Sequence, residues 1–168
     1  AGLCPEGKWC GRATIVPVDC GPGTYCPAGS GSPNLCEEGT WSDKALLVSA
    51  DECRSCPPGS SCAPGSATPK TCSQGTYSAD WGRPKCEDCV AGSFQDAPNA
   101  TACAACPAGT YCEARASAAL LCPVGTWNGT ANATSIDDCD ECPAGFACVA
   151  GATAPLPCDA GSVSSAGS

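Results

Sequence analysis

Histidine and methionine are absent from the 168 residues, and aromatic residues make up only 5% of the chain. Without histidine, neither a Ser-His-Asp nor a Cys-His arrangement can form, which excludes the commonest nucleophilic catalytic sites. So few large apolar side chains leave little material for one large hydrophobic core. No apolar run approaches the length of a membrane span, so the sequence predicts no membrane contact within this segment.

Positive charge is also scarce, because eight Lys and Arg face 17 Asp and Glu and give a net charge of −9. The basic residues are scattered along the chain, so they form no cluster that could neutralise a phosphate backbone. The sequence therefore predicts no nucleic-acid partner.

Cysteine, by contrast, is abundant: 19 of the 168 residues, or about 11%, are cysteines, which is a level typical of disulfide scaffolds. Glycine and proline add 20 and 16 turn-forming residues. Covalent cross-links must then supply the stability that burial cannot. Because disulfides persist in oxidising compartments, we expect an extracellular or cell-surface location, reached through the secretory pathway.

The cysteines follow a repeated frame. The stretch 103–127 carries a CxxC, a five-residue gap to Cys112, a nine-residue gap to Cys122 and then Gly-Thr-aromatic. The frame recurs at 53–72 and 139–158 and, without its first cysteine, at 4–20 and 20–36. Fixed spacing of this kind predicts a tandem array. We expect two short cysteine loops of a partial repeat at 1–36, repeats at 36–89 and 89–139, and a repeat truncated at its C-terminal end at 139–168.

Each half-repeat opens with Cys-x-x-Gly, often Cys-Pro-x-Gly. This pattern predicts a β-turn with proline at its second position and glycine at its last. A small residue and then an aromatic residue follow, and a Thr-aromatic pair favours a short extended segment. We therefore expect short β-strands and turns with almost no helix. Local cross-links further predict that each module contacts only its neighbours.

Most aromatic residues occupy one slot, two positions after the glycine of the turn. We interpret these rings as the miniature core of each module, covering the nearby disulfide; a carbohydrate-binding aromatic stripe is the alternative. Trp81 and Phe146 are outside the slot. The slot is filled by Trp9, Tyr25, Trp41, Tyr77, Phe94, Tyr111 and Trp127.

An odd number of cysteines leaves at least one without an internal partner. Pairing each cysteine with its neighbour closes every loop and leaves Cys158 free or bonded outside the segment. The opposite phase would close each CxxC into a tight ring typical of redox sites. A crossed pattern such as Cys53–Cys62 with Cys56–Cys72 stays open, since spacing alone does not fix connectivity. The neighbour order gives Cys4–Cys10, Cys20–Cys26, Cys36–Cys53, Cys56–Cys62, Cys72–Cys86, Cys89–Cys103, Cys106–Cys112, Cys122–Cys139 and Cys142–Cys148.

Three Asn-x-Thr sequons predict N-glycosylation at Asn99, Asn128 and Asn132. They point to a eukaryotic secretory protein. All three asparagines lie in long loops, which would have to face solvent to carry glycans.

Metal binding and catalysis find little support. Four CxxC motifs could form two Cys4 zinc sites, but zinc would leave the other regularly spaced cysteines without partners. Acidic residues beside the CxxC steps are interpreted as solvated turn residues; a weak calcium site near Asp137, Asp138, Asp140 and Glu141 is the alternative. We predict no catalytic residue, no metal and no cofactor, and therefore no enzyme.

Two stretches carry a family resemblance: Cys72-Ser-Gln-Gly-Thr-Tyr-Ser before Cys86 and Cys89, and Cys122-Pro-Val-Gly-Thr-Trp before Cys139. They resemble the ephrin-receptor-like (GCC2/GCC3) cysteine-rich repeats, whose pattern is C-x-x-G-T-Y-S, a spacer, then C-x-x-C-P-x-G. Residues 4–36 depart from it, because two small loops follow each other without a CxxC. The resemblance implies a small disulfide-rich fold, an elongated tandem array of EGF- or TNF-receptor-like modules.

The family occurs in receptor ectodomains and in protist and algal surface or fibre proteins, and its modules are extracellular and nonenzymatic. The resemblance therefore implies a structural, glycosylated, disulfide-stapled rod segment of an extracellular filament, flagellar hair, wall or matrix protein. Its partners would be covalent glycans and copies of itself or other fibre or matrix glycoproteins. The alternative is the stalk of a cell-surface receptor or adhesin whose ligand-binding domain lies outside this segment.

Overall fold

The computed structural model describes residues 2–12, 15–159 and 162–167. The chain forms two compact units: Ala1–Cys72 with Ser78–Cys86, and Ser73–Tyr77 with Glu87–Ser168. Within the described residues every strand is two residues long, and the helical structure amounts to two 3-10 turns. The predicted fold class, disulfide-rich modules of short strands and turns, is confirmed.

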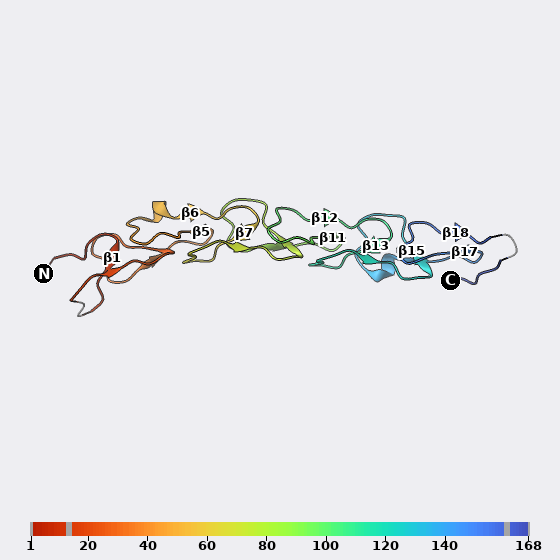
Figure 1. Cartoon of the computed structure of the whole chain (residues 1–168), viewed down its shortest axis with the longest axis horizontal. Helices are drawn as coiled ribbons and strands as arrows, with labels where there is room; N and C mark the ends of the chain where they lie inside the picture. The colour runs from red at the N-terminus through yellow and green to blue at the C-terminus, as the bar shows by residue number, and fades with distance from the viewer. Residues whose placement is uncertain (1, 13–14, 160–161, 168) are drawn as a thin grey trace. The chain divides into compact units, whose positions relative to one another are not determined.

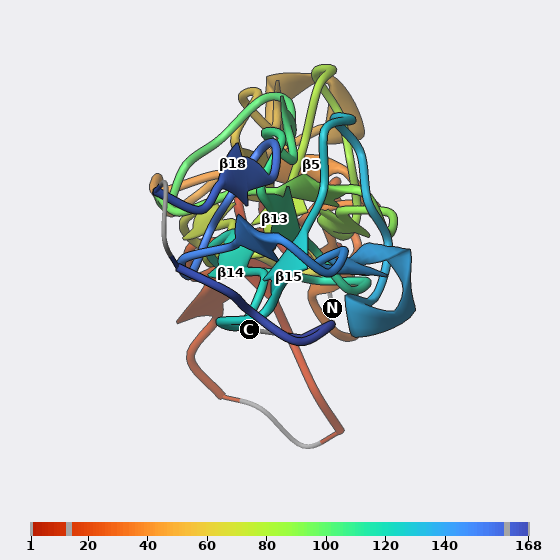
Figure 2. The ribbon, with the colours of Figure 1, turned by 90° about the vertical axis from the view of Figure 1, so that its right-hand side faces the viewer.

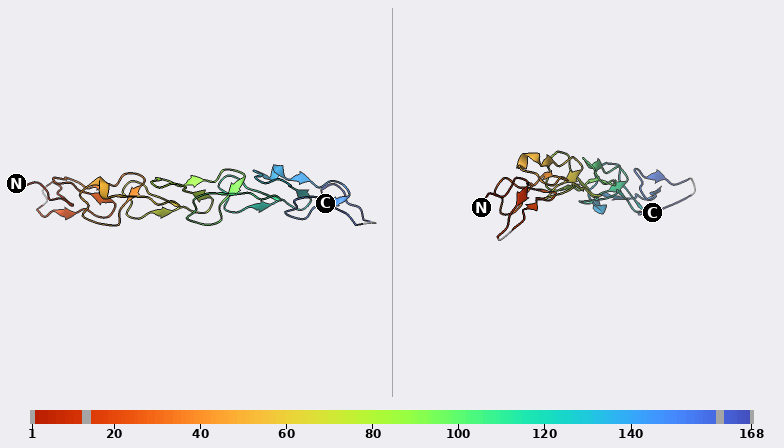
Figure 3. Two further views of the ribbon diagram at one scale, coloured as in Figure 1. Left: turned by 90° about the horizontal axis from the view of Figure 1, so that it is seen from above. Right: turned by 60° about the vertical axis from the view of Figure 1, so that its left-hand side comes forward.

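The strands pair as consecutive antiparallel hairpins, nine among the described residues. Within each unit the hairpins follow one another in sequence order (Figures 1 and 3). The first unit holds β1 (Lys8–Trp9), β2 (Val18–Asp19), β3 (Thr24–Tyr25), β4 (Asn34–Leu35), β5 (Thr40–Trp41), η1 (Ala50–Glu52), β6 (Arg54–Ser55), β7 (Ser60–Ser61) and β8 (Lys70–Thr71). The second holds β9 (Thr76–Tyr77), β10 (Glu87–Asp88), β11 (Ser93–Phe94), β12 (Ala104–Ala105), β13 (Thr110–Tyr111), β14 (Leu120–Leu121), β15 (Thr126–Trp127), η2 (Ile136–Asp138), β16 (Asp140–Glu141), β17 (Phe146–Ala147) and β18 (Leu156–Pro157).

We call a module the segment from one hairpin-opening cysteine to the next. The hairpin β13–β14 shows the design: Thr110 pairs with Leu121, and the N–H of Cys122 donates to the carbonyl of Gly109 at 2.9 Å. The cysteine that opens the next module thus extends the hairpin of the present one. The opening cysteines are Cys4, Cys20, Cys36, Cys56, Cys72, Cys89, Cys106, Cys122 and Cys142.

The turn at the start of each module begins one residue later than the sequence predicted. In the module of Cys106, the carbonyl of Pro107 accepts the N–H of Thr110 at 3.2 Å, so Gly109 is the third turn residue, with φ 78°. That position of a type II turn needs a positive φ, which favours glycine. The Thr110 hydroxyl donates to the same carbonyl at 2.7 Å, which explains the small hydroxyl residue after the glycine. The same hydroxyl bond recurs at Thr24, Thr40, Thr76, Ser93 and Thr126.

Within the described residues, each module from that of Cys20 to that of Cys142 also has a second left-handed residue, in the loop after its first strand, and Gly167 holds the same place after Cys158. Gly65 is an example: its φ is 76°, and its N–H donates to the carbonyl of Cys36, the cysteine that opens the preceding module, at 2.9 Å. We call this position the left-handed loop residue. In the described residues it is filled by Gly29, Leu46, Gly65, Gly82, Asn99, Arg115, Asn132, Gly151 and Gly167.

Two further backbone hydrogen bonds join adjacent modules. At the junction of the Cys36 and Cys56 modules, the Gly39 N–H donates to the Cys62 carbonyl at 2.8 Å and the Ser42 N–H to the Ser66 carbonyl at 3.1 Å. Because backbone groups make all three bonds of a junction, the pattern tolerates different side chains. The second unit repeats it, with Gly92 to Cys112 at 2.8 Å and Gln95 to Ala116 at 3.0 Å.

Contacts between these modules, each of which is half of a predicted repeat, also reach beyond the adjacent one. A Cβ on Gly7 would lie 2.8 Å from the carbonyl oxygen of Leu46, two modules further along. A Cβ on Gly92 would lie 2.6 Å from the carbonyl oxygen of Asn132, again two modules away. The turn glycine therefore leaves room for the backbone of the module after next.

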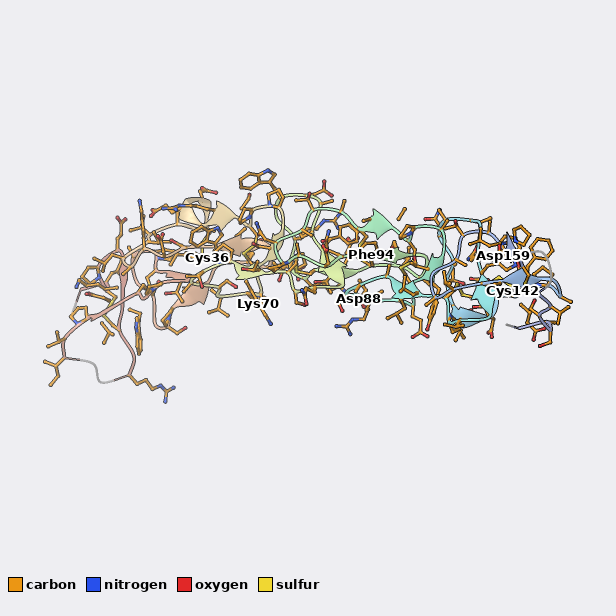
Figure 4. The ribbon with its side chains drawn as sticks, turned by 45° about the vertical axis from the view of Figure 1, so that its right-hand side comes forward. Cys36, Lys70, Asp88, Phe94, Cys142 and Asp159 are labelled. Carbon is orange, nitrogen blue, oxygen red and sulfur yellow. A yellow bond between two sulfur atoms is a disulfide. The ribbon has the colours of Figure 1, made fainter. Side chains whose placement is uncertain are left out.

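The core of each unit consists mainly of cysteines. Half-buried rings pack against it, as Trp127 and Phe146 do against Cys142, Cys148 and Ala152; Cys142 is labelled in Figure 4. This packing agrees with the interpretation of the rings as module cores.

Candidate functional site: the disulfides and the loop of residues 128–138

The disulfides of the described residues join nine pairs of cysteines, the same pairs as the neighbour order. Their Cα–Cα separations run from 5.7 Å to 6.2 Å, within the usual range. Cys158 has a free thiol, which lies 3.4 Å from the Ser164 hydroxyl oxygen. The pairing stays a prediction for peptide mapping, which would contradict it by finding Cys53–Cys56 or Cys103–Cys106.

Two kinds of module differ in where the second cysteine stands. In the short kind it directly follows the first strand, as in Cys106–Cys112. In the long kind it precedes the second strand, as in Cys122–Cys139, and a polar residue takes the place after the first strand. That place is buried at Ser42, Ser78 and Asn128, which are 0%, 1% and 4% exposed, and half-buried at Gln95.

Asn128, a predicted glycosylation site, therefore lies inside the second unit. Its Oδ1 accepts the N–H and the hydroxyl of Thr130, both at 2.8 Å. Its Nδ2 is buried without a hydrogen-bond partner. Its backbone N–H donates to the Ala152 carbonyl at 3.0 Å, so the residue is part of a module junction.

The other two predicted glycosylation sites are exposed. Asn99 and Asn132 are both left-handed loop residues, with φ of 62° and 66°, and both are exposed to solvent. Asparagine tolerates this backbone region better than most residues. These two positions satisfy the solvent access that a glycan needs, and the glycans themselves remain a prediction.

The loop that follows Asn132 ends in η2, which stands out from β14 and β15 (Figure 2). The Asp138 carboxylate caps this turn: it accepts the N–H of Thr134 at 2.6 Å, the Thr134 hydroxyl at 3.0 Å and the N–H of Ser135 at 3.2 Å. Chiefly the backbone bond from Thr134, then the one from Ser135, hold the pKa of Asp138 below its ordinary value.

Of the acidic residues considered for calcium, Asp138 is thus occupied with the cap. Asp140 and Glu141 form β16, where successive side chains point to opposite faces. Among the described residues, no three or more His, Cys, Asp or Glu side chains gather in a way that could hold a metal ion. The calcium alternative remains untested.

An open groove of about 630 Å³ lies along this loop. Aromatic, amide, hydroxyl and carboxylate groups meet in it. Its lining residues are Trp127, Asn128, Gly129, Thr130, Ala131, Asn132, Ala133, Thr134, Asp137, Asp138 and Asp140.

The repeated hairpins, their disulfides and their junction bonds define a tandem array of cysteine-rich modules. Residues 75–119, from Gly75 to just before β14, match the family described as tyrosine-protein kinase ephrin type A/B receptor-like. The resemblance predicted from the cysteine motifs is confirmed. No curated protein matches the sequence.

Family and disulfides together indicate an extracellular or surface disulfide-rich segment. Receptor-like cysteine-rich repeats of this family are typically nonenzymatic. Across the part of the chain that the structure describes, no helix is both long and apolar enough to cross a bilayer.

Sequence reasoning missed two features of these sites. The left-handed loop residue was not predicted, because Leu46 and Arg115 give no signal of positive φ. A longer repeat was visible but overlooked: the cysteine frame of 20–72 recurs 86 residues further on, from Cys106 to Cys158.

Proposed function

We propose that the chain is a structural, glycosylated, disulfide-stapled rod segment of an extracellular filament, flagellar hair, wall or matrix protein. The observation that carries the proposal is the repeated junction, in which backbone hydrogen bonds tie each module to the next in both units. Because disulfides shorten the free loops within the modules, a chain of such junctions has few soft points at which to bend. The expected result is a stiff segment.

Its partners are copies of itself or other fibre or matrix glycoproteins, together with covalent glycans. The proposal includes no catalytic residue, cofactor, metal or nucleic acid. We expect side-by-side association to use backbone groups of the short strands that the junctions leave unpaired.

The test is made on the chain secreted from eukaryotic cells with its disulfides intact. Small-angle scattering and negative-stain imaging are expected to show extended particles, which become flexible chains after complete reduction. A near-spherical scattering profile, or rods that stay intact after full reduction, would contradict the proposal. Analytical ultracentrifugation over a concentration series tests self-association. A chain that is monomeric at every concentration would contradict the proposal that copies of the chain bind one another.

The second candidate is the stalk of a cell-surface receptor or adhesin whose ligand-binding domain lies outside this segment. The match of residues 75–119 to a receptor-like family favours it. The product of the full-length gene discriminates the two: a membrane span or a recognition domain beside these modules supports the stalk, whereas unbroken repeats support the fibre.

A further inference from the structure

Two sequons four residues apart share one loop but not one environment. Asn128 is 4% exposed, whereas Asn132 is exposed to solvent. By the sequence motif alone, the two asparagines are equally good candidates for N-glycosylation. The structure separates them.

Asn128 is closed to modification in the folded chain. The nitrogen that would carry the sugar, Nδ2, is buried, and Thr130 holds Oδ1 through two hydrogen bonds of 2.8 Å. Its backbone is held from both sides, because its carbonyl accepts the Gly109 N–H at 2.7 Å and its N–H donates to Ala152 at 3.0 Å. A glycan on Nδ2 would therefore have to displace the Asn128 side chain from its buried position, at a residue whose backbone is fixed by both adjacent modules.

Asn132 combines an open side chain with a fixed backbone. Its N–H donates to the Cys106 carbonyl at 2.7 Å, and its own carbonyl lies against Gly92, where an added Cβ would approach to 2.6 Å. The attachment point of a glycan on Asn132 would therefore be held in place by two other modules. A rigid attachment point directs the first sugar toward the surface beside it.

That surface is the groove of about 630 Å³, which Asn132 itself lines. Its volume falls within the range of about 300–1,000 Å³ that is usual for small-molecule sites. A sugar ring has an apolar face that can pack on the indole of Trp127. Its hydroxyls can donate to the carboxylates of Asp137 and Asp140, which also line the groove.

We propose that Asn132, and not Asn128, carries the N-linked glycan, and that the first N-acetylglucosamine of this glycan lies in the groove against Trp127. The proposal deepens the proposed function, since it rests on a glycosylated secreted chain. Trp127 packs on Cys142, Cys148 and Ala152, so the sugar covers the ring that covers the Cys142–Cys148 disulfide. The glycan thereby shields the next module.

The first experiment measures occupancy by glycopeptide mass spectrometry on chain secreted from a glycosylating host. Thr130→Ala removes the sequon of Asn128, and Asn132→Asp removes the other attachment point while keeping a residue that tolerates the left-handed region. Thr130→Ala is expected to leave the number of glycans unchanged, and Asn132→Asp to lower it by one. A glycan found on Asn128, or none on Asn132, overturns the proposal.

The second experiment tests where the sugar lies. The Trp127 indole resonance is compared by NMR among intact chain, chain trimmed enzymatically to a single sugar, and Asn132→Asp. Trimming is expected to leave the resonance in place and Asn132→Asp to shift it. Asn99→Asp, the matched change at the other exposed sequon, is expected to leave it unmoved.

An occupied Asn132 whose loss does not move the Trp127 resonance overturns placement of the sugar in the groove. This outcome is separate from failure of the structural role, which scattering measures on chains with or without glycans. A compact, near-spherical particle contradicts the rod and leaves the assignment of Asn132 standing.

Discussion

A glycine can be required for its positive φ or for the empty space beside it, and a turn glycine and a left-handed loop glycine allow the two requirements to be separated. Gly39 and Gly82 have nearly equal φ, 76° and 75°. A Cβ on Gly39 would lie 2.8 Å from the carbonyl carbon of Gly82, whereas the nearest atom to a Cβ on Gly82 is 3.9 Å away. The same substitution at the two positions therefore differs mainly in steric overlap.

Gly82→Ala is expected to cost about 1–2 kcal/mol, the penalty of the left-handed conformation for a residue with a Cβ. Gly39→Ala adds overlap with backbone, which cannot rotate away, so roughly a further 1–3 kcal/mol is expected. Calorimetric unfolding with the disulfides intact measures both variants. Equal losses would show that φ alone, and not steric overlap, selects glycine at these two positions.

Leu46 and Leu47 are adjacent residues with opposite roles. Leu46 is the left-handed loop residue, with φ 66° and a side chain that is 47% exposed, whereas Leu47 is 4% exposed. Leu46→Gly removes the left-handed penalty of about 1–2 kcal/mol. It also costs roughly 0.5–1 kcal/mol of stability, because glycine loses more backbone entropy on folding. Its stability is expected to match or slightly exceed that of the parent.

Leu47→Ala is the matched change, and it is expected to cost about 2–5 kcal/mol because it removes a buried side chain. The same calorimetric measurement ranks the two variants. If Leu46→Gly proves as damaging as Leu47→Ala, the exposed leucine has a packing role that the left-handed loop position does not explain.

At the scale of elements, the turn η2 depends on one ionised side chain. The folded-state pKa of Asp138 lies below its ordinary value of 3.8, because N–H groups of Thr134 and Ser135 donate to the charged form. A lowered folded-state pKa stabilises the turn at every pH above the ordinary value. This contribution is lost as the pH falls through the lowered pKa.

An acid titration followed by NMR is expected to show the amide resonances of Thr134 and Ser135 moving together below pH 3.8, the ordinary value for Asp138. Asp138→Asn is expected to remove this movement. Asp137→Asn is the control, since Asp137 enters the cap through its backbone N–H, which donates to the Ser135 hydroxyl oxygen. Persistence of the movement in Asp138→Asn would assign the titration to another group.

The hairpins were predictable from the sequence to within a residue, because Cys-x-x-Gly-Thr-aromatic combines a turn signal with an extended pair. The turn begins one residue later than predicted, because Gly109, with its positive φ, is the third residue of the turn and not the last. The burial of Asn128 was not predictable, because the Asn-x-Thr motif does not reveal that Asn128 directly follows the first strand of its module and is enclosed there. The contacts of Gly7 and Gly92 with the module after next were not predictable either, because they are made with backbone carbonyls, which every residue carries.

At the scale of the whole molecule, the repeat of 86 residues also governs side-chain contacts between modules. Leu35 ends β4, and its side chain lies beside Gly65. A Cβ added to Gly65 would be 3.0 Å from the Cδ2 atom of Leu35. Leu121, at the end of β14, lies in the same way against Gly151, at 2.9 Å. In each unit an exposed leucine side chain therefore lies against the left-handed loop glycine two modules later. A larger residue in place of that glycine would require the leucine to move out of its rotamer, which gives module order a small energetic effect even though the junction bonds are uniform.

Two grafts of equal length test this constraint. Replacing 122–158 with a copy of 36–72 keeps the order of long and short modules, and Leu121 then meets the copy of Gly65. Replacing 122–158 with a copy of 20–56 reverses the order, and Leu121 meets the copy of Leu46 instead. The first graft is expected to unfold at nearly the parent temperature. The second is expected to lose roughly 0.5–1.5 kcal/mol, the cost of moving the Leu121 side chain out of its rotamer.

For a chain of this size, each kcal/mol corresponds to a change of about 2–4 °C in the unfolding temperature, so calorimetry resolves the two grafts. Leu121→Ala removes the side chain that collides with the copy of Leu46, and it is expected to restore part of the lost stability in the second graft only. Because both grafts keep a hairpin-opening cysteine at each end, their disulfides can close within modules, and peptide mapping verifies this. Equal stability of the two grafts would mean that any module can follow any other, with the backbone junctions alone determining the array.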